Sequence, residues 1–194
     1  MGLLSFFART QHTFIRVVWV ALVVLQGCAA LHPRRIAEPL PHFVQVDAGL
    51  YRGGQPSLEG IRQLAKMGVK TIVNLRRHSR KMDEERDLAG QLGMRWVNIP
   101  VRAWWRPSET QIRQFLVIAA GPASRPVFVH CRLGRNRSGL MVAAYRMVCQ
   151  GWAPGQAYAE ARRFGLAPWN LITWHVIFRE IPSEFFAAPA ASKF

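Results

Sequence analysis

The chain has 194 residues, half of them apolar, which is enough to bury one hydrophobic core of ordinary size. No internal repeat is visible, and three cysteines are too few for a disulfide framework, so we expect one domain behind a leader, acting as a monomer. The formal net charge of +15 favours a polyanionic substrate or an anionic lipid surface, and we expect no nucleic-acid partner.

The first 27 residues have the pattern of a secretory signal peptide. Arg9 and Arg16 precede an uninterrupted apolar run, residues 17–25, and Gln26 follows it. The run is shorter than the roughly 20 residues that a membrane-spanning helix needs. Residues 1–27 are therefore predicted to be a signal peptide that directs the chain out of the cytoplasm.

The end of this leader, residues 25–28, resembles the lipobox of bacterial lipoproteins. The resemblance implies that Cys28 becomes the lipidated first residue and anchors the protein to a membrane of the bacterial cell envelope. Because residue 29 is alanine rather than aspartate, the resemblance to lipoproteins of diderm bacteria favours the outer membrane, on its periplasmic side. An uncleaved inner-membrane anchor and a plain signal peptide are the alternatives. Residues 28–42 would then form a linker to the domain.

Strand and helix patterns alternate through residues 43–186 and predict an α/β domain. Two short segments and three buried ones rich in Val and Ile predict strands, and helical patterns between them end at glycines. This order predicts a single domain with a central, mostly parallel sheet of about four or five strands flanked by helices. Residues 187–194 would form a tail. The predicted strands are 43–46, 50–52, 71–75, 95–99 and 126–130, and the predicted helices are 58–67, 84–92, 108–120, 137–149, 153–163 and 174–186.

Residues 130–139, His-Cys-Arg-Leu-Gly-Arg-Asn-Arg-Ser-Gly, lie between the last predicted strand and a helix. A tight loop that feeds a helix leaves several backbone N–H groups unpaired near the positive end of the helix dipole, which suits a phosphate. The same field would hold Cys131 as a thiolate well below the free thiol pKa of about 8.5. The segment therefore predicts a nucleophilic cysteine in an anion-binding loop.

The spacing within this loop assigns a purpose to three further residues. Arg137 returns at the first turn of the helix, where its planar fork can bind two oxygens of one phosphate. Gly134 allows a positive φ where the loop closes around the oxygens, and Ser138 places a hydroxyl near the sulfur. An ordinary buried cysteine flanked by solvated arginines is the alternative reading, which the number of co-occurring features disfavours.

These residues resemble the signature of the cysteine-dependent protein tyrosine and dual-specificity phosphatases, His-Cys-x5-Arg followed by Ser or Thr and Gly. Residues 50–57 and 68–76 are similar to the amino-terminal half of the small atypical dual-specificity branch. The resemblance covers residues 43–186 and implies the tyrosine-phosphatase-like α/β fold. It also implies a reaction through a phosphocysteine that water hydrolyses, without a metal or another cofactor.

The resemblance also assigns roles by position. Cys131 is the implied nucleophile, Arg137 would stabilise the transferring phosphoryl group, Ser138 the leaving thiolate, and His130 would orient the cysteine. The loop amides would bind the phosphate oxygens. These implied phosphate-binding residues are Arg132, Leu133, Gly134, Arg135, Asn136 and Arg137.

The chain departs from this family in its general acid. Most members protonate the leaving oxygen with an aspartic acid in an upstream loop, but the corresponding residues 97–107 contain no carboxylate. The candidates are Asp83, Asp87 and Glu109, of which Glu109 is the weakest because the first turn of a helix stabilises negative charge. Either Asp83 or Asp87 reaches the site, or the substrate has a leaving group that needs little protonation.

Several basic clusters are expected to surround the loop. If Arg76 ends a strand parallel to the one that ends at His130, both loops open at the carboxyl edge of the sheet, where ligands bind. This favours a phosphorylated protein, carrying phosphotyrosine or phosphoserine, or a polyanionic inositol or lipid phosphate. A rhodanese-like sulfurtransferase and a catalytically weak anion-binding lipoprotein are the alternative functions.

Overall fold

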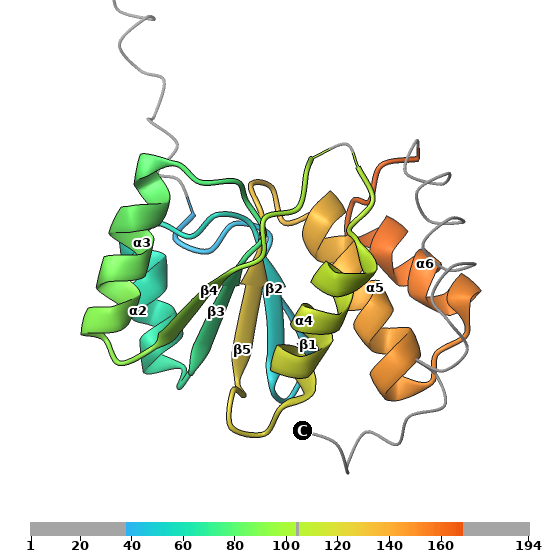
Figure 1. Ribbon diagram of the computed structural model, residues 1–194, viewed down its shortest axis with the longest axis horizontal. Helices are drawn as coiled ribbons and strands as arrows, with labels where there is room; N and C mark the ends of the chain where they lie inside the picture. The colour runs from blue at the N-terminus through green and yellow to red at the C-terminus, as the bar shows by residue number, and fades with distance from the viewer. Residues whose placement is uncertain (1–37, 104, 169–194) are drawn as a thin grey trace, which may run out of the picture. The chain divides into compact units, whose positions relative to one another are not determined.

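A computed structural model describes residues 38–103 and 105–168 (Figure 1). The predicted leader, Cys28, the predicted helix at 174–186 and the tail at 187–194 lie outside these residues. None of the helices in the described ranges is long and apolar enough to cross a membrane. The elements in chain order are β1 (Val44–Asp47), β2 (Leu50–Gly53), α2 (Leu58–Lys66), β3 (Thr71–Asn74), α3 (Arg80–Gln91), β4 (Arg95–Asn98), α4 (Glu109–Ala120), β5 (Val127–His130), α5 (Asn136–Gln150) and α6 (Pro154–Arg163).

The five strands form one sheet in the order β1-β2-β5-β3-β4. Only β1 is antiparallel, and the other four strands run parallel to one another. The predicted mostly parallel sheet is therefore confirmed. Gly53, Asn74 and His130, the last residues of β2, β3 and β5, lie side by side in register, so the loops that follow these strands leave from one edge.

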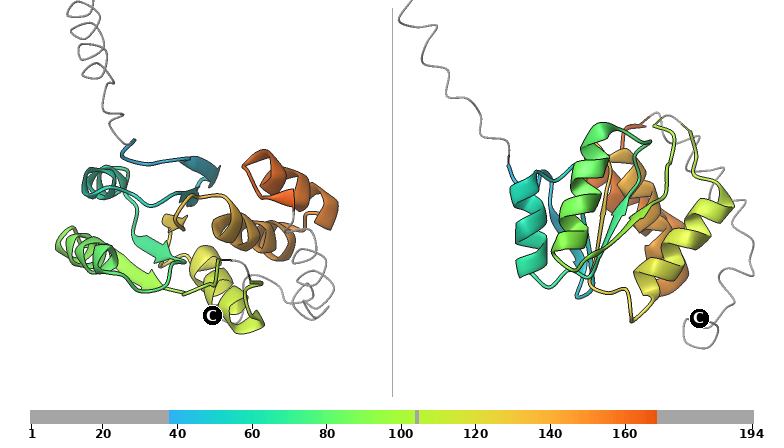
Figure 2. Two further views of the ribbon diagram at one scale, coloured as in Figure 1. Left: turned by 90° about the horizontal axis from the view of Figure 1, so that it is seen from above. Right: turned by 60° about the vertical axis from the view of Figure 1, so that its left-hand side comes forward.

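Helices cover both faces of the sheet (Figure 2). The α2 and α3 helices lie on one face, over an apolar cluster that includes Ile72 and Phe128. The α4, α5 and α6 helices lie on the other face, over a larger cluster that includes Val73 and Val127. Neighbouring strand residues enter opposite clusters because side chains alternate between the faces of a sheet.

Most helix boundaries follow the local signals in the sequence. At the start of α4, Ser108 Oγ accepts a hydrogen bond from the Gln111 N–H, while Gln111 Oε1 accepts one from the Ser108 N–H. The start of α3 differs from the prediction, because the helix begins at Arg80 rather than at residue 84. Its first turn is Arg-Lys-Met-Asp, which has only one apolar residue, so apolar periodicity marks the helix too late.

Candidate active site

Cys131 follows the central strand β5 directly, at the point where the chain turns into α5. Its side chain is 3% exposed, and its Sγ lies 3.6 Å from the Oγ of Ser138. Ser138 is itself buried in the first turn of α5. The structure therefore places a thiol at the sheet edge where ligands bind in open α/β folds.

The surroundings of Cys131 stabilise its thiolate. Burial acts to raise the pKa of the thiol, because it disfavours the charged form. The backbone N–H and hydroxyl of Ser138, the charge of Arg137 and the backbone N–H of Gly134 act in the opposite direction and outweigh burial. The pKa of Cys131 is therefore held below its ordinary value, as nucleophilic chemistry near neutral pH requires.

The carbonyl groups of the loop are held by donors from β2 and the segment after it. Arg52 donates from Nη2 to the carbonyl oxygens of Gly134 and Arg135, at 2.8 and 3.2 Å. The backbone N–H of Gln55 donates to the carbonyl oxygen of Arg132 at 3.2 Å. With these three carbonyls engaged, the loop presents N–H groups to an anion beside the sulfur.

Gly134 adopts the positive φ that its place in the loop predicts. Its φ is +69°, in the left-handed region. A Cβ at this position would lie 2.5 Å from the carbonyl carbon of Gly53 and from the nitrogen of Gly54. Glycine is therefore required twice here, by the backbone conformation and by the close approach of the segment after β2.

Arg137 reaches from the first turn of α5 toward the ends of β3 and β4. Its Nη1 donates to the carbonyl oxygens of Leu75 at 3.2 Å and Val101 at 3.5 Å. The pKa of Arg76 is lowered, mainly by burial and next by the charge of Arg137. The Cys131 thiolate acts in the opposite direction on the pKa of Arg76, so both groups lie close to it. Two guanidinium groups therefore meet beside the sulfur.

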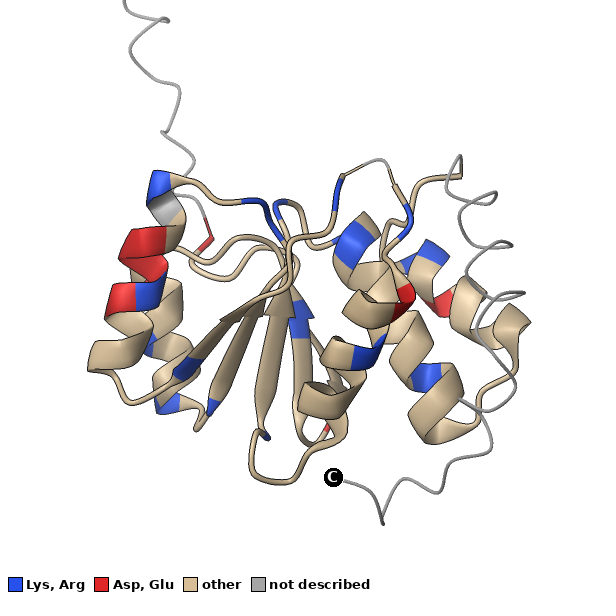
Figure 3. Ribbon diagram, viewed as in Figure 1, with Lys and Arg blue, Asp and Glu red and all other residues tan. Residues whose placement is uncertain are grey.

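Basic residues gather on the loops at this edge of the sheet (Figure 3). The loops that follow β3, β4 and β5 all contribute, as the parallel pairing of β3 with β5 predicts. Such a concentration of positive charge attracts a ligand that carries several negative charges. The residues are Arg76, Arg77, Arg102, Arg106, Arg132 and Arg135.

His130, the residue before Cys131, is held by a buried carboxylate that the sequence did not reveal. Its Nε2 lies 2.8 Å from Oε1 of Glu85, and both side chains are almost completely buried. Its Nδ1 lies 3.3 Å from the carbonyl oxygen of Cys131. Both ring nitrogens thus face oxygen acceptors, which fixes the orientation of the ring beneath the loop.

Glu85 accepts hydrogen bonds from three further side chains. Asn74 Nδ2 donates at 3.2 Å, Trp96 Nε1 at 2.8 Å and Gln55 Nε2 at 2.5 Å. Burial acts to raise the pKa of this carboxyl, but the charge and hydrogen bond of His130, with the bonds from Trp96 and Gln55, lower it below its usual value. Glu85 is therefore a fully partnered buried carboxylate.

The spacing of residues along α3 could have indicated that Glu85 is buried, but it does not identify the partners of the carboxylate. Met82, Glu85 and Ala89 are all buried and fall three and four residues apart on one face of α3, and an acid on the buried stripe of a helix needs a partner. Gln55 occupies the segment after β2, where its Oε1 accepts from Arg76 at 2.5 Å. Through Gln55, the carboxylate beneath the loop is connected to a guanidinium beside the sulfur.

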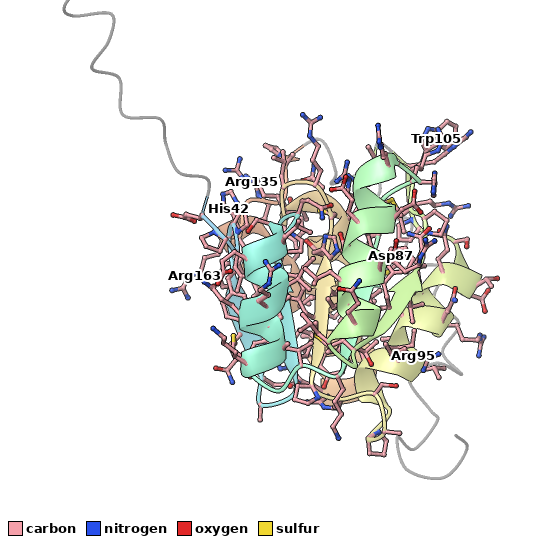
Figure 4. All side chains as sticks on the ribbon, turned by 90° about the vertical axis from the view of Figure 1, so that its left-hand side faces the viewer. His42, Asp87, Arg95, Trp105, Arg135 and Arg163 are labelled. Carbon is pink, nitrogen blue, oxygen red and sulfur yellow. The ribbon has the colours of Figure 1, made fainter. Side chains whose placement is uncertain are left out.

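The three candidate general acids are all at least partly exposed, and each pairs with an arginine of its own helix. Asp83 and Asp87 lie 3.2 and 3.0 Å from the guanidinium of Arg86, and Asp87 projects from the outer side of α3 (Figure 4). Glu109 lies 2.8 Å from Arg113. Either aspartate would have to leave its ion pair to protonate a leaving group at the loop.

The second described cysteine, Cys149, has a different environment from Cys131. It is half-buried in the last turn of α5, and burial raises its pKa to about 11. Neither of the two is in a disulfide. Across residues 38–103 and 105–168, no three His, Cys, Asp or Glu side chains are grouped so that they could hold a metal ion.

Comparison with known proteins shows a family that extends over most of the described domain. Residues 42–166 match the family described as DSP-PTPase phosphatase fused to NAD+ kinase. The chain is 32% identical over 129 residues to the dual specificity protein phosphatase TpbA of Pseudomonas aeruginosa, covering 66% of this chain but only 56% of that protein. It is also 32% identical over 129 residues to the putative tyrosine-protein phosphatase OCA1 of Mycosarcoma maydis, covering 65% of this chain and 81% of the relative.

Solved structures agree with the predicted fold. The crystal structure of P. aeruginosa TpbA matches with a TM-score of 0.63 and 26% identity, covering 76% of this chain and 89% of that one. The catalytic core of the phosphatase SIW14 from S. cerevisiae matches in fold with a TM-score of 0.66 at 21% identity, covering 76% and 90%. Together with the match over residues 42–166, these relatives show that the chain belongs to the dual-specificity type of the protein tyrosine phosphatase family.

Proposed function

We propose that this chain is a phosphatase that works through a covalent phosphocysteine. The proposal is carried by the buried thiol of Cys131, which lies 3.6 Å from Ser138 Oγ at the start of α5 and has a lowered pKa. Membership of the family supports it. The overall reaction is hydrolysis of a phosphate ester or anhydride.

In the first step the thiolate of Cys131 attacks phosphorus. An S–P bond forms, the bond from phosphorus to the leaving oxygen breaks, and that oxygen keeps the electron pair. Arg137 and the loop amides bind the oxygens of the transferring phosphoryl group. In the second step water attacks phosphorus, the S–P bond breaks, and the thiolate recovers its electron pair. Inorganic phosphate departs and the proton of the water passes to solvent.

Ser138 stabilises the sulfur during these steps, and His130 positions the loop that carries the sulfur. The Ser138 hydroxyl, at 3.6 Å, donates to the thiolate when it is the nucleophile and again when it is the leaving group. His130 acts as a positioning residue, because its ring is fixed between Glu85 and the carbonyl group of Cys131. It orients the start of the loop without touching the phosphate.

We propose a polyanionic substrate whose leaving group needs little protonation, namely a phosphoanhydride or an aryl phosphate. Residues 97–107 carry no carboxylate, and Asp83 and Asp87 are engaged with Arg86. Two relatives support this choice: one is named inositol diphosphatase DSP4, of Arabidopsis thaliana, and a TpbA variant has been solved in complex with phosphotyrosine. Phosphoserine and lipid phosphates, which have alkyl leaving groups, are expected to react more slowly.

The test is phosphate release by the purified full chain in detergent, under reducing conditions and without added metal. We expect turnover of an inositol pyrophosphate and of phosphotyrosine, slower turnover of phosphoserine, and a loss of at least about 10³-fold in Cys131→Ser. Cys149→Ser, the matched cysteine control, should retain activity within about twofold. Equal turnover in Cys131→Ser would exclude the phosphocysteine, and folded protein without any turnover would favour the anion-binding alternative.

We further propose that the protein is a lipoprotein of the bacterial envelope, anchored through Cys28 and facing the periplasm. The support is the leader alone, in which two arginines precede the apolar run at residues 17–25 and the lipobox-like residues 25–28. Incorporation of labelled palmitate tests the proposal. We expect label in the wild type and in Cys149→Ser and none in Cys28→Ala, and label retained in Cys28→Ala would contradict it.

A further inference from the structure

A cavity of about 270 Å³ lies beside the catalytic loop, residues 131–137, on the β2 side of β5. Residues of the segment before β1, of β2, of the loop itself and of the end of α6 line it. The site for the reacting phosphate differs in position, because Arg137 and Arg76 meet on the β3 side of β5. The two sites therefore share the loop but approach it from opposite sides.

The lining of this cavity is strongly basic. Arg52, Arg135, Arg163 and His42 contribute to it, and no Asp or Glu of the described residues does. Figure 4 shows His42, Arg135 and Arg163 along one edge of the domain, although they come from three separate segments. Positive charge brought together in this way attracts an anion.

Arg52 gives the most specific indication of a ligand. The residue is 1% exposed, and among residues 38–103 and 105–168 its Nε and Nη1 have no hydrogen-bond partner, because only Nη2 bonds to the loop carbonyls. The guanidinium lies over the ring of Phe164 at 5.4 Å, a contact that stabilises the charge but accepts no in-plane hydrogen bond from these nitrogens. Buried donors of a charged group rarely lack an acceptor, so the arrangement is incomplete without one.

Two of the basic residues that line the cavity, Arg135 and His42, bond to each other. Nη2 of Arg135 donates to Nε2 of His42 at 3.0 Å, and this bond joins the loop to the segment before β1. The volume accommodates a tetrahedral oxyanion with several waters, since one water occupies about 30 Å³. The cavity thus combines suitable size and charge with a buried guanidinium in its wall, two nitrogens of which have no acceptor among the described residues.

We propose that this cavity binds a phosphate-type oxyanion, with Arg52 and Arg163 as its principal ligands. The anion is either the second phosphate group of a substrate held at the catalytic loop or a free inorganic anion, and both present the same acceptor oxygens. The site depends on the fold and its charges, not on turnover.

The proposal can be tested by the NMR signal of the Arg52 Nε–H group, observed in the full chain with ¹⁵N-labelled arginine. The Arg137→Met background weakens binding at the catalytic loop, so that the signal reports on the cavity. Inorganic phosphate and an aryl bisphosphate are the two probes. We expect a saturable shift whose Kd rises about three- to tenfold in Arg163→Gln, because one charge-assisted hydrogen bond is lost.

Arg95→Gln is the matched control, because Arg95 is also exposed and lies on β4, away from the cavity (Figure 4). It should leave the Kd unchanged. A shift with inorganic phosphate supports a site for a free anion, and a shift with the bisphosphate alone supports a subsite for substrate. The proposal is overturned by no shift with either probe, or by the same Kd in Arg163→Gln as in the parent. Failure of the phosphatase assay would leave this result unaffected.

Discussion

Glu85 and Arg52 are both buried charged residues that support the catalytic loop, from opposite faces of the sheet. Glu85, on the α3 side, accepts hydrogen bonds from His130, Asn74, Trp96 and Gln55. Arg52 faces α5 and α6 and, within the part of the chain that the structure describes, uses one of its three nitrogens, to bond the carbonyl oxygens of the loop.

The difference in partners indicates that Glu85 stabilises the fold, whereas Arg52 is suited to bind a ligand. A buried ion whose partners are all present stabilises one conformation, and removing it leaves those partners without a bond. A buried ion with unsatisfied donors contributes less to the folded state by itself, because part of its desolvation cost is not recovered. We infer that the α3 face fixes the loop and that the α5–α6 face leaves room for a ligand.

The largest expected effect follows from removing Glu85. In Glu85→Ala the buried groups of His130, Asn74 and Trp96 lose their acceptor, so the free energy of unfolding should fall by about 3–5 kcal/mol. Glu85→Gln keeps an acceptor oxygen and should cost about 1–2 kcal/mol. Urea denaturation followed by tryptophan fluorescence measures both. A loss below about 1 kcal/mol in Glu85→Ala would show that the network does not stabilise the fold.

The free energy of unfolding should also decrease as the pH is lowered, because of Glu85. Glu85 has a folded pKa below its unfolded value of about 4.3, so its contribution is present above that pH and is lost as pH falls through the folded pKa. Denaturation curves at a series of acidic pH values should therefore show a steeper loss in the wild type than in Glu85→Gln. Parallel curves for the two proteins would contradict the assignment.

Arg52→Met should have a smaller effect on stability and a larger one on activity. An apolar side chain replaces a charge that is only partly paired, so unfolding should change by no more than about 1–2 kcal/mol. The carbonyl groups of Gly134 and Arg135 lose their donor, and kcat/KM should fall about tenfold as the loop loses its fixed geometry. If Arg52→Met destabilised the fold as much as Glu85→Ala, the distinction between the two faces would not hold.

The fold was predictable because most of its strands are short segments that contain Val or Ile, and all five lie within one or two residues of their predicted bounds. The loop was predictable because its chemistry is local: Cys131, Arg137 and Ser138 are neighbours in sequence. The start of α3 was not predictable from apolar periodicity, because the first turn of this helix is mainly polar and charged.

The supports of the loop were not predictable from local pattern. Glu85 and His130 are 45 residues apart, and Arg52 lies 82 residues from Gly134, so their contacts exist only once the sheet has formed. A charged residue in a predicted strand does not reveal by itself whether it faces the core or solvent. The buried face becomes known from the order of the strands, which the sequence did not specify.

Ser138→Ala tests the loop itself, with a moderate expected effect. The hydroxyl helps to lower the pKa of Cys131, so its removal should raise that pKa and move the acid limb of kcat/KM to higher pH. The loss of rate should be about three- to tenfold on the acid side and should shrink as pH rises. Ser138→Thr keeps a hydroxyl and serves as the control. An unshifted acid limb in Ser138→Ala would show that the hydroxyl does not lower the pKa of Cys131.

The smallest effects are expected from the exposed acids of α3. Glu85 bonds to His130 beneath the loop, whereas Asp83 pairs with Arg86 and His78, and Asp87 pairs with Arg86. Asp83→Asn and Asp87→Asn should therefore each change kcat for phosphotyrosine by less than about twofold. Phosphoserine is the sharper substrate, because its alkoxide leaving group depends most on a proton donor. A loss of more than about tenfold on phosphoserine in one variant, with the alkaline limb of its pH profile flattened, would identify that aspartate as the general acid. The α3 face would then take part in proton transfer as well as support the loop.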